Sequence, residues 1–379
     1  MTSDRAPKAR LALEDGTSFA GTAFGGGRPA AGEVVFNTGM VGYPEALTDP
    51  SYRGQILVLT YPLVGNYGVP AYRVDASGLP SGFESAEIQI AGLVVSRLSP
   101  TYSHRDAALG LAEWLRGADV PGIADVDTRA LTKRLRERGT MLGKIDLETI
   151  ETAFSDPNST DLVGMVCPRR AARLGPLPGA VGGAPRIVLM DCGCKASIAR
   201  SLLERGFAVE RVPPGHYFFD GDYDGLVVSN GPGDPRAVLP AVRNIERALA
   251  VGRPILGICL GHQLLALAAG FETYKMKFGH RGQNHPCVEH GVDEIGPSTG
   301  PSRKCFITSQ NHGYAVHDVG APPEWRVWFT NANDGTVEGI RHRTKPFFGV
   351  QFHPEARPGP TDTAWVFDAF ADAVREVRR

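Results

Sequence analysis

A cysteine between two glycines is the residue of this chain best placed to act as a nucleophile. The segment Gly-Ile-Cys-Leu-Gly (257–261) follows an apolar run that predicts a short buried strand, and it precedes a stretch over 264–269 that predicts a helix ended by Gly270. The glycines remove Cβ atoms where the backbone must turn sharply. The Cys259 sulfur would then lie at the N-terminus of a helix, whose dipole stabilises negative charge. The alternative is a cysteine that only packs, since free cysteine is among the most buried residue types.

A nucleophilic cysteine needs a base, and the base needs a group that orients it. A strand predicted over 347–352 runs directly into His353-Pro354-Glu355. A histidine and a glutamate two residues apart at a strand end can project toward one pocket, where the carboxylate would fix the imidazole tautomer. The pair alone is weak evidence, because a surface histidine beside a glutamate is common.

Two further segments offer groups that could bind a substrate. Asn-Gly-Pro-Gly-Asp-Pro (230–235) follows a predicted strand, and its glycines let backbone N–H groups approach a ligand closely. The N–H groups of Gly233 and Leu260 would form an oxyanion hole, although an ordinary turn has the same composition. Gln-Asn-His-Gly-Tyr (310–314) follows a strand predicted over 305–308 and supplies polar groups for a small polar substrate.

The elements that carry these segments predict a parallel sheet in the C-terminal half. Strands predicted over 186–190, 207–212 and 225–229 alternate with helices over 195–205 and 238–250. This alternation is typical of an α/β domain with helices on both faces of the sheet. Such a sheet places its site beyond the carboxyl ends of its strands, which is where Cys259 lies.

The N-terminal half has a different pattern. An Asp-Gly turn between alternating apolar residues predicts a hairpin over 10–19. The other predicted elements are strands over 33–37, 55–60 and 91–95, a loop over 38–54, and helices over 109–115 and 128–138. We therefore expect a mixed, strand-rich α/β domain over 1–173. The Gly- and Pro-rich segment 174–185 predicts a linker, so the parallel-sheet domain would span 186–379.

Taken together and in this order, the four motifs resemble those of the class I, or triad, glutamine amidotransferases. The resemblance implies that Cys259 attacks the side-chain amide of L-glutamine, that His353 acts as base and acid, and that Glu355 orients His353. It also implies that water hydrolyses the resulting thioester to glutamate after ammonia has left.

The N-terminal half resembles a narrower family, the small subunits of carbamoyl-phosphate synthetases. The resemblance is carried by Phe-Asn-Thr-Gly-Met-Val-Gly-Tyr-Pro-Glu (36–45), Thr-Asp-Pro-Ser-Tyr (48–52), Gly-Asn-Tyr-Gly (65–68), Ile-Ala-Asp-Val-Asp-Thr-Arg (123–129) and, in the C-terminal half, Met-Lys-Phe-Gly-His-Arg-Gly-Gln-Asn-His-Pro (276–286). It implies that glutamine is contacted by Ser51, Gly231, Gly233, Leu260, Gln263, Asn311, Gly313 and Tyr314. Because Ser51 belongs to the first domain, the site would lie near the domain interface. Cys194, Gln283 and Tyr314 depart from the family pattern, but none of these changes removes a catalytic group.

The composition excludes several classes of partner. The formal net charge is -1 and the pI is near 6.8, so the chain has no basic field to recruit nucleic acid and no polybasic membrane patch. No apolar run approaches membrane-spanning length, and no apolar core of a signal peptide follows the polar residues 1–5. Six cysteines in a chain of this size do not form a disulfide scaffold, so we expect reduced thiols in the cytoplasm.

One group of residues has the composition of a zinc site. His280, His285, Cys287 and His290 lie close together in the sequence, but their spacing matches no standard zinc finger. The family resemblance already accounts for this segment as far as Pro286. We therefore expect no metal on this chain.

The expected function is that of the glutamine-hydrolysing small subunit of a carbamoyl-phosphate synthetase. The sequence contains no Gly-x-x-x-x-Gly-Lys-Ser/Thr phosphate loop, so we expect no cofactor here. ATP and Mg²⁺ would bind a separate large subunit, which would use the ammonia to make carbamoyl phosphate for arginine and pyrimidine synthesis. The alternatives are a stand-alone amidase or peptidase on the same scaffold, and a catalytically silent regulatory subunit. The intact set of Cys259, His353 and Glu355 argues against the silent subunit.

Overall fold

The computed structural model describes residues 7–174, 183–291 and 304–378 and divides the chain into two compact units. The first unit comprises Met1–Arg73 and Pro80–Leu162, and the second comprises Val74–Leu79 and Val163–Arg379. Most of the predicted linker lies outside the described residues. Residues 163–174 group with the second unit, whereas the sequence-based division assigned the chain up to 173 to the first domain. The physical reason is that β12 (Ala172–Leu174) pairs antiparallel with β14 (Ala208–Val212) and forms one edge of the sheet of the second unit.

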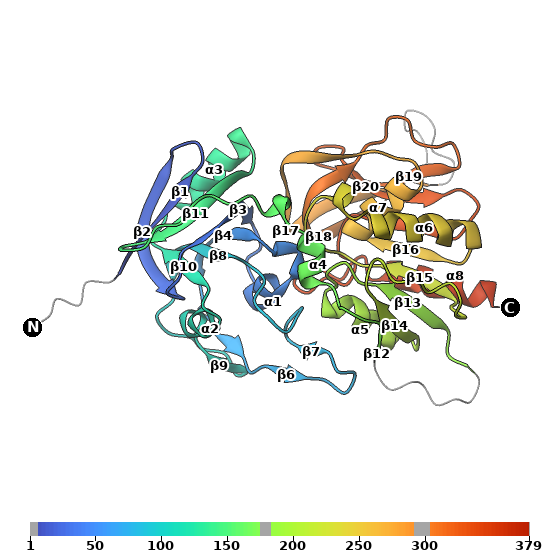
Figure 1. The fold of residues 1–379 in the computed structure, drawn as a ribbon, viewed down its shortest axis with the longest axis horizontal. Coiled ribbons are helices and arrows are strands. Elements are labelled where there is room, and N and C mark those ends of the chain that lie inside the picture. Colours follow the sequence, from blue (N-terminus) through green and yellow to red (C-terminus); the bar gives the residue numbers. More distant parts are fainter. Residues whose placement is uncertain (1–6, 175–182, 292–303, 379) are drawn as a thin grey trace, which may run out of the picture. The chain divides into compact units, whose positions relative to one another are not determined.

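The first unit is built on a closed barrel (Figure 1). Its seven strands follow the order β1-β11-β3-β4-β8-β10-β2. Their bounds are β1 (Lys8–Leu13), β2 (Ser18–Gly25), β3 (Ala30–Asn37), β4 (Gln55–Val64), β8 (Gly92–Leu98), β10 (Pro121–Ala124) and β11 (Met141–Leu147). The predicted hairpin is confirmed, since β1 and β2 pair antiparallel. The closure was not predicted, because it depends on pairing between strands that are far apart in the sequence, such as β1 with β11.

The prediction of a loop over 38–54 is wrong in part, because this segment contains a helix. α1 (Tyr43–Thr48) begins after Gly42, whose φ of 80° is readily adopted only by glycine, and a 3₁₀ turn, η1 (Pro50–Tyr52), follows it. These two elements bury Leu47 and Tyr52 in the core of the first unit. The segment contains polar and proline residues that interrupt any apolar periodicity, so its burial could not be predicted from the sequence.

The remaining elements of this part of the chain are short strands and helices. They are β5 (Val69–Pro70), β6 (Arg73–Val74), β7 (Pro80–Ser81), β9 (Ala107–Leu109), α2 (Leu111–Gly117), α3 (Thr128–Arg138), η2 (Pro157–Ser159) and α4 (Leu162–Val166). The predicted helix over 128–138 is confirmed. The Asp127 carboxylate accepts a hydrogen bond from the Ala130 N–H at its start, and Gly139 ends it with a φ of 102°.

The second unit is organised around one ten-stranded sheet of order β12-β14-β13-β15-β16-β21-β20-β18-β17-β19. The strands are β13 (Arg186–Met190), β14 (Ala208–Val212), β15 (Gly225–Val228), β16 (Ile255–Ile258), β17 (Thr273–Glu289), β18 (Cys305–Val316), β19 (Trp325–Asn331), β20 (Val337–His342) and β21 (Phe347–Val350). The predicted parallel sheet is confirmed, since β14, β13, β15, β16 and β21 pair in parallel. The antiparallel half, from β21 to β19, was not predicted.

Helices cover both faces of this sheet, as the alternating pattern predicted (Figure 1). α5 (Ala196–Glu204) and α8 (Trp365–Val377) bury Ile198 and Phe370 in one apolar cluster. α6 (Leu239–Val251), which follows a short turn, η3 (Pro235–Ala237), and α7 (Leu260–Ala268) bury Ile245 and Leu264 in the other cluster. α7 is thereby fixed against the sheet, and it is the helix that follows Cys259.

Two general features of the described structure bear on the expected class of protein. None of its helices combines the length and the apolar character that crossing a membrane requires. All six cysteines are free thiols.

Candidate active site

Cys259 occupies a sharp turn between β16 and α7. Its φ of 55° and ψ of −106° are unusual for a residue with a side chain. A Cβ on Gly257 would lie 2.5 Å from the Gly261 carbonyl oxygen, and a Cβ on Gly261 would lie 2.1 Å from the Val228 carbonyl oxygen. Glycine is therefore required at both positions, and the turn has the geometry of a nucleophile elbow.

His353 and Glu355 follow β21, the strand paired in parallel with β16. His353 Nδ1 lies 2.6 Å from Glu355 Oε1, and both side chains are buried. Burial disfavours the charged imidazolium, but the Glu355 carboxylate and the Cys259 sulfur together outweigh this effect and raise the pKa of His353.

Lys195 is a buried member of the site that the sequence analysis missed. Its Nζ lies 3.0 Å from Glu355 Oε1, and it donates a 2.7 Å hydrogen bond to the Ala356 carbonyl oxygen. Burial would raise the pKa of Glu355, but Lys195 and His353 together hold it well below its usual value. Glu355 is therefore ionised and held between two cationic groups. Nothing in the sequence shows that Lys195 is buried, because a lysine just before a helix is usually exposed to solvent.

The predicted oxyanion loop, residues 230–233, lies at the carboxyl end of β15, next to β16 in the sheet. Asn230 Oδ1 accepts a 3.0 Å hydrogen bond from the Lys195 N–H, which fixes the start of the loop. A Cβ on Gly231 would lie 2.1 Å from the Cys192 carbonyl oxygen, and Gly233 has a φ of 87°. The loop therefore needs its glycines, and Leu260 begins the helix that follows the elbow.

The segment 310–314, predicted to follow a strand over 305–308, is itself part of that strand, because β18 extends over Cys305–Val316. It pairs with β17, so its polar residues are held in a regular ladder. The Asn311 carbonyl oxygen lies 3.5 Å from Cys259 Sγ. Gln263, on α7, donates its side-chain N–H groups to the Tyr314 carbonyl oxygen at 2.8 Å and to Gln351 Oε1 at 3.0 Å. Its carbonyl oxygen is what remains to bind a ligand.

The predicted site residues thus fall into two groups. The second unit contains Cys259, His353, Glu355, Gly231, Gly233, Leu260, Gln263, Asn311, Gly313 and Tyr314. Ser51 belongs to the first unit, where it is buried in η1 and its N–H donates a 2.9 Å hydrogen bond to Asp49 Oδ1. Its contact with glutamine remains a prediction.

The four residues that suggested zinc do not form a common site in the described structure. Cys287 Sγ lies 3.5 Å from Thr308 Oγ1, and His290 Nε2 lies 2.9 Å from Thr330 Oγ1. A different buried group, made of His280, His312 and Glu338, has potential ligand atoms within 4.8 Å of one another. This group is linked by hydrogen bonds, which are described below.

We expect purified protein to contain no stoichiometric zinc, because the ring nitrogens of His280 and His312 already contact oxygen atoms of other side chains or of the backbone. Elemental analysis of the native protein gives the metal content directly. Treatment with a chelator should leave the rate of glutamine hydrolysis unchanged. One zinc per chain would contradict this expectation.

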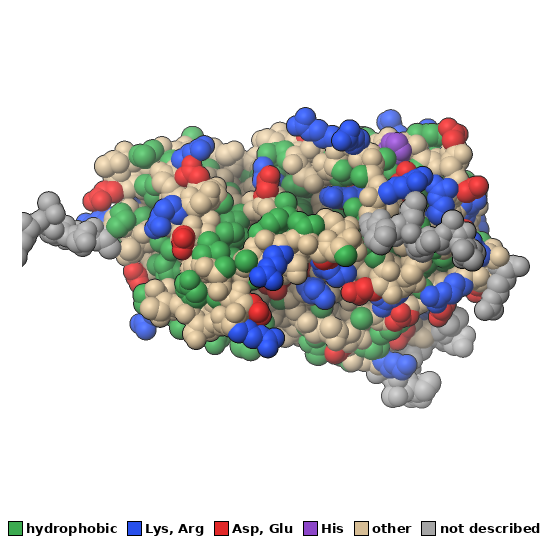
Figure 2. Space-filling view, turned by 90° about the horizontal axis from the view of Figure 1, so that it is seen from below, with side chains coloured by type: hydrophobic (Ala, Val, Ile, Leu, Met, Phe, Trp, Pro, Cys, Tyr) green, Lys and Arg blue, Asp and Glu red, His purple; other side chains and the backbone are tan. Residues whose placement is uncertain are grey.

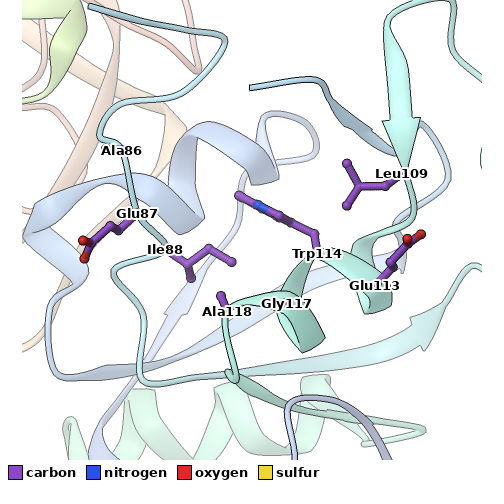
Figure 3. A pocket seen from close by; sticks show the side chains of 8 residues that line it. All are labelled: Ala86, Glu87, Ile88, Leu109, Glu113, Trp114, Gly117 and Ala118. Carbon is purple, nitrogen blue, oxygen red and sulfur yellow. The ribbon is translucent and has the colours of Figure 1, made fainter. Parts of the chain in front are cut away.

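The first unit also contains a pocket of about 610 Å³ that none of the predicted site residues lines (Figure 3). Ile88, Leu109 and the Trp114 ring provide its apolar wall, and Glu87 and Glu113 lie at its sides.

Comparisons with known proteins match the two halves of the chain to two descriptions. Residues 11–145 match "Carbamoyl-phosphate synthase small chain, CPSase domain", and residues 188–373 match "Glutamine amidotransferase class-I". The chain is 47% identical to multifunctional protein CAD of Squalus acanthias, over 98% of this chain and 16% of that protein. It is 46% identical to multifunctional protein pyrABCN of Emericella nidulans, over 97% of this chain and 17% of that protein.

A third relative has a name that bears on the nitrogen source. The chain is 44% identical to "Carbamoyl-phosphate synthase [ammonia], mitochondrial" of Mus musculus, over 99% of this chain and 24% of that protein. The chain thus spans between 16% and 24% of the length of these three relatives.

Proposed function

Because the chain belongs to the family of carbamoyl-phosphate synthase small chains and carries a class I glutamine amidotransferase domain, we propose that it hydrolyses L-glutamine and supplies ammonia for carbamoyl phosphate synthesis. The observation that carries the proposal is the arrangement of Cys259 on its elbow with His353 and Glu355 at the end of the neighbouring strand. This is the nucleophile, base and orienter of a triad.

In the proposed reaction, Cys259 Sγ attacks the side-chain amide carbon of glutamine. The raised pKa of His353 keeps its imidazole protonated, so His353 can give a proton to the departing nitrogen as the C–N bond breaks. Ammonia leaves and a thioester remains on Cys259. His353, now neutral, takes a proton from water, which hydrolyses the thioester to glutamate and regenerates the thiolate.

The backbone around Cys259 would stabilise the negative charge that develops on the amide oxygen. The N–H groups of Leu260 and Gly233 are the proposed donors, since they follow the carboxyl ends of neighbouring parallel strands. Gln263, Asn311, Gly313, Tyr314 and Gly231 would bind the rest of the glutamine molecule. Glu355, fixed by Lys195, keeps the His353 ring in the orientation that both proton transfers need.

The ammonia would pass to a large synthetase subunit, which would bind ATP and Mg²⁺ while this chain binds no cofactor. The relatives are several times longer than this chain, so the synthetase domains can be fused to it or carried on a partner chain.

The first unit exposes several large apolar side chains as candidate contacts for such a partner: Met40, Val41, Tyr61, Leu63 and Tyr72. Figure 2 shows hydrophobic side chains among interspersed charges on one face of the molecule. We propose a heterodimer in the cytoplasm that serves arginine and pyrimidine synthesis.

The mouse relative is named for ammonia, so overall similarity alone does not decide whether this chain uses glutamine. The test is glutamate release from L-glutamine by the purified chain, alone and with the large subunit. Glutamate release with the large subunit, together with glutamine-dependent carbamoyl phosphate, is the expected result. No glutamate under either condition would favour a silent subunit, and hydrolysis of other amides without any partner would favour a stand-alone amidase.

Ser51→Ala should weaken glutamine binding severalfold, because a hydrogen bond to a bound polar ligand typically contributes about 0.5–1.5 kcal/mol. The Michaelis constant for glutamine measures the effect. Ser77→Ala is the matched control, since Ser77 lies in another turn and its backbone N–H binds Asp75 Oδ1 as that of Ser51 binds Asp49. Unchanged glutamine kinetics in Ser51→Ala would place Ser51 outside the site.

A further inference from the structure

A buried polar cluster lies along β18, the strand that carries Asn311, Gly313 and Tyr314. The cluster consists of His280 on β17, Gln310 and His312 on β18, Asn331 on β19 and Glu338 on β20, with Asp334 at its edge. Side chains alternate between the faces of a strand, so Gln310 and His312 project from one face and Asn311 from the other. The cluster therefore contacts β18 from the side opposite the Asn311 side chain.

Short polar contacts connect the cluster to the helix that follows the nucleophile. His280 Nδ1 lies 3.1 Å from Gln310 Oε1, and the same oxygen lies 2.8 Å from His312 Nε2. His312 Nδ1 lies 2.8 Å from the Tyr314 carbonyl oxygen, which also accepts a hydrogen bond from Gln263 on α7. Burial lowers the pKa of His312, so its neutral ring donates a hydrogen bond to one of these two oxygens and packs against the other. The path thus runs from β17 through β18 to a residue four positions after Cys259.

The backbone is shaped to allow this close packing. β17 has an irregular register with β18 between Lys275 and His280, and Gly279 there has a φ of 68°. A Cβ on Gly279 would lie 2.3 Å from the His312 carbonyl oxygen. Glycine at this position therefore lets β17 approach His312.

The cluster also holds charge. Burial would lower the pKa of His280, but Glu338 and Asp334 raise it overall, so the ring is protonated. Its Nδ1 lies 3.2 Å from Glu338 Oε1, and its Nε2 lies 2.8 Å from Asp334 Oδ2. Glu338 is fully buried and also accepts a 2.9 Å hydrogen bond from Asn331 Nδ2. Removing one partner of a buried charged pair leaves the other uncompensated, so the arrangement is sensitive to loss of either charge.

We propose that His280 and Glu338 are positioning residues for glutamine: their buried pair fixes Gln310 and His312, and thereby the β18 backbone from 311 to 314 that binds the substrate. The inference rests on the proposed function. The pair touches neither the substrate nor the reacting atoms. Its loss should therefore weaken substrate binding and leave the bond-breaking steps largely intact.

Glu338→Gln tests the proposal, because it keeps the shape of the side chain and removes its charge. We expect the Michaelis constant for glutamine to rise on the order of tenfold and kcat to stay within about twofold of the wild-type value. The matched control is Glu289→Gln. Glu289 lies at the end of β17, the strand that carries His280, and accepts a hydrogen bond from Trp328 Nε1, outside the path to β18. The control should leave both constants unchanged.

A second measurement separates substrate positioning from the reactivity of the sulfur. Alkylation of Cys259 by iodoacetamide needs no glutamine site, whereas alkylation by a diazoketone analogue of L-glutamine does. The rate for each reagent can be followed by mass spectrometry of the peptide that contains Cys259. In Glu338→Gln the diazoketone reaction should slow on the order of tenfold at low reagent concentration, and the iodoacetamide reaction should not slow.

Asp334→Asn provides a second test if Glu338→Gln does not fold. The Asp334 side chain is 44% exposed, so the protein should tolerate the loss of its charge. The substitution should raise the Michaelis constant about two- to threefold, a smaller effect in the same direction. An unchanged Michaelis constant in the folded variants would overturn the inference, as would stoichiometric zinc at His280, His312 and Glu338. A wild-type chain that hydrolyses no glutamine, even with the large subunit, would instead overturn the proposed function itself.

Discussion

Replacement of Cys259 by serine should reduce glutamine hydrolysis roughly a thousandfold or more, because a hydroxyl is a far weaker nucleophile than a thiolate and the thioester cannot form. The fold should be unchanged, since serine fits the same turn and Gly257 and Gly261 still allow it. In complex with the large subunit, the variant should still make carbamoyl phosphate from added ammonium. The measurements are glutamate release and carbamoyl phosphate formation from each nitrogen source.

Cys305→Ser is the control for this experiment, because Cys305 is an exposed free thiol at the start of β18 and the chemical change is the same. It should leave both activities unchanged. Glutamine-dependent synthesis that survives in Cys259→Ser would show that another residue supplies the nucleophile. Loss of the ammonium-dependent reaction as well would mean that the substitution acts through the fold or the partner interface.

The sharp turn at Cys259 could be predicted from sequence because its constraints are local. The turn at Cys259 admits only glycine two residues before and after it, so the motif records the geometry directly. The parallel strands and helices of the second unit were equally predictable, since each is a short apolar segment bounded by turn residues. His353 and Glu355 followed from their place at the end of one such strand.

Other features depend on contacts that no local pattern records. The barrel closes through pairing of β1 with β11, and the sequence between these strands does not specify that pairing. Gln310 and His312 resemble loop residues because they are polar, yet they are buried in β18 and satisfied by His280 and the backbone. Lys195 is hidden for the same reason: only the fold shows that it is buried against Glu355.

The activity proposed for Cys259, His353 and Glu355 should depend on the large subunit. Ammonia released to water becomes ammonium and ceases to be a nucleophile, so hydrolysis without a ready synthetase is wasteful. This consideration favours a triad that becomes fully competent only when the large subunit is in place. Catalytic hydrogen bonds often tighten only in the productive complex.

We therefore expect the isolated chain to hydrolyse glutamine slowly. The rate should rise when the large subunit binds, and rise again when that subunit receives ATP and bicarbonate. A partner can accelerate the step by favouring the catalytically competent geometry of Cys259 and His353. A coupling of about 1–3 kcal/mol corresponds to a change of roughly 5–150-fold. Steady-state glutamate release under the three conditions measures the effect. Equal rates under all three conditions would contradict the predicted coupling and would favour an amidase that acts alone.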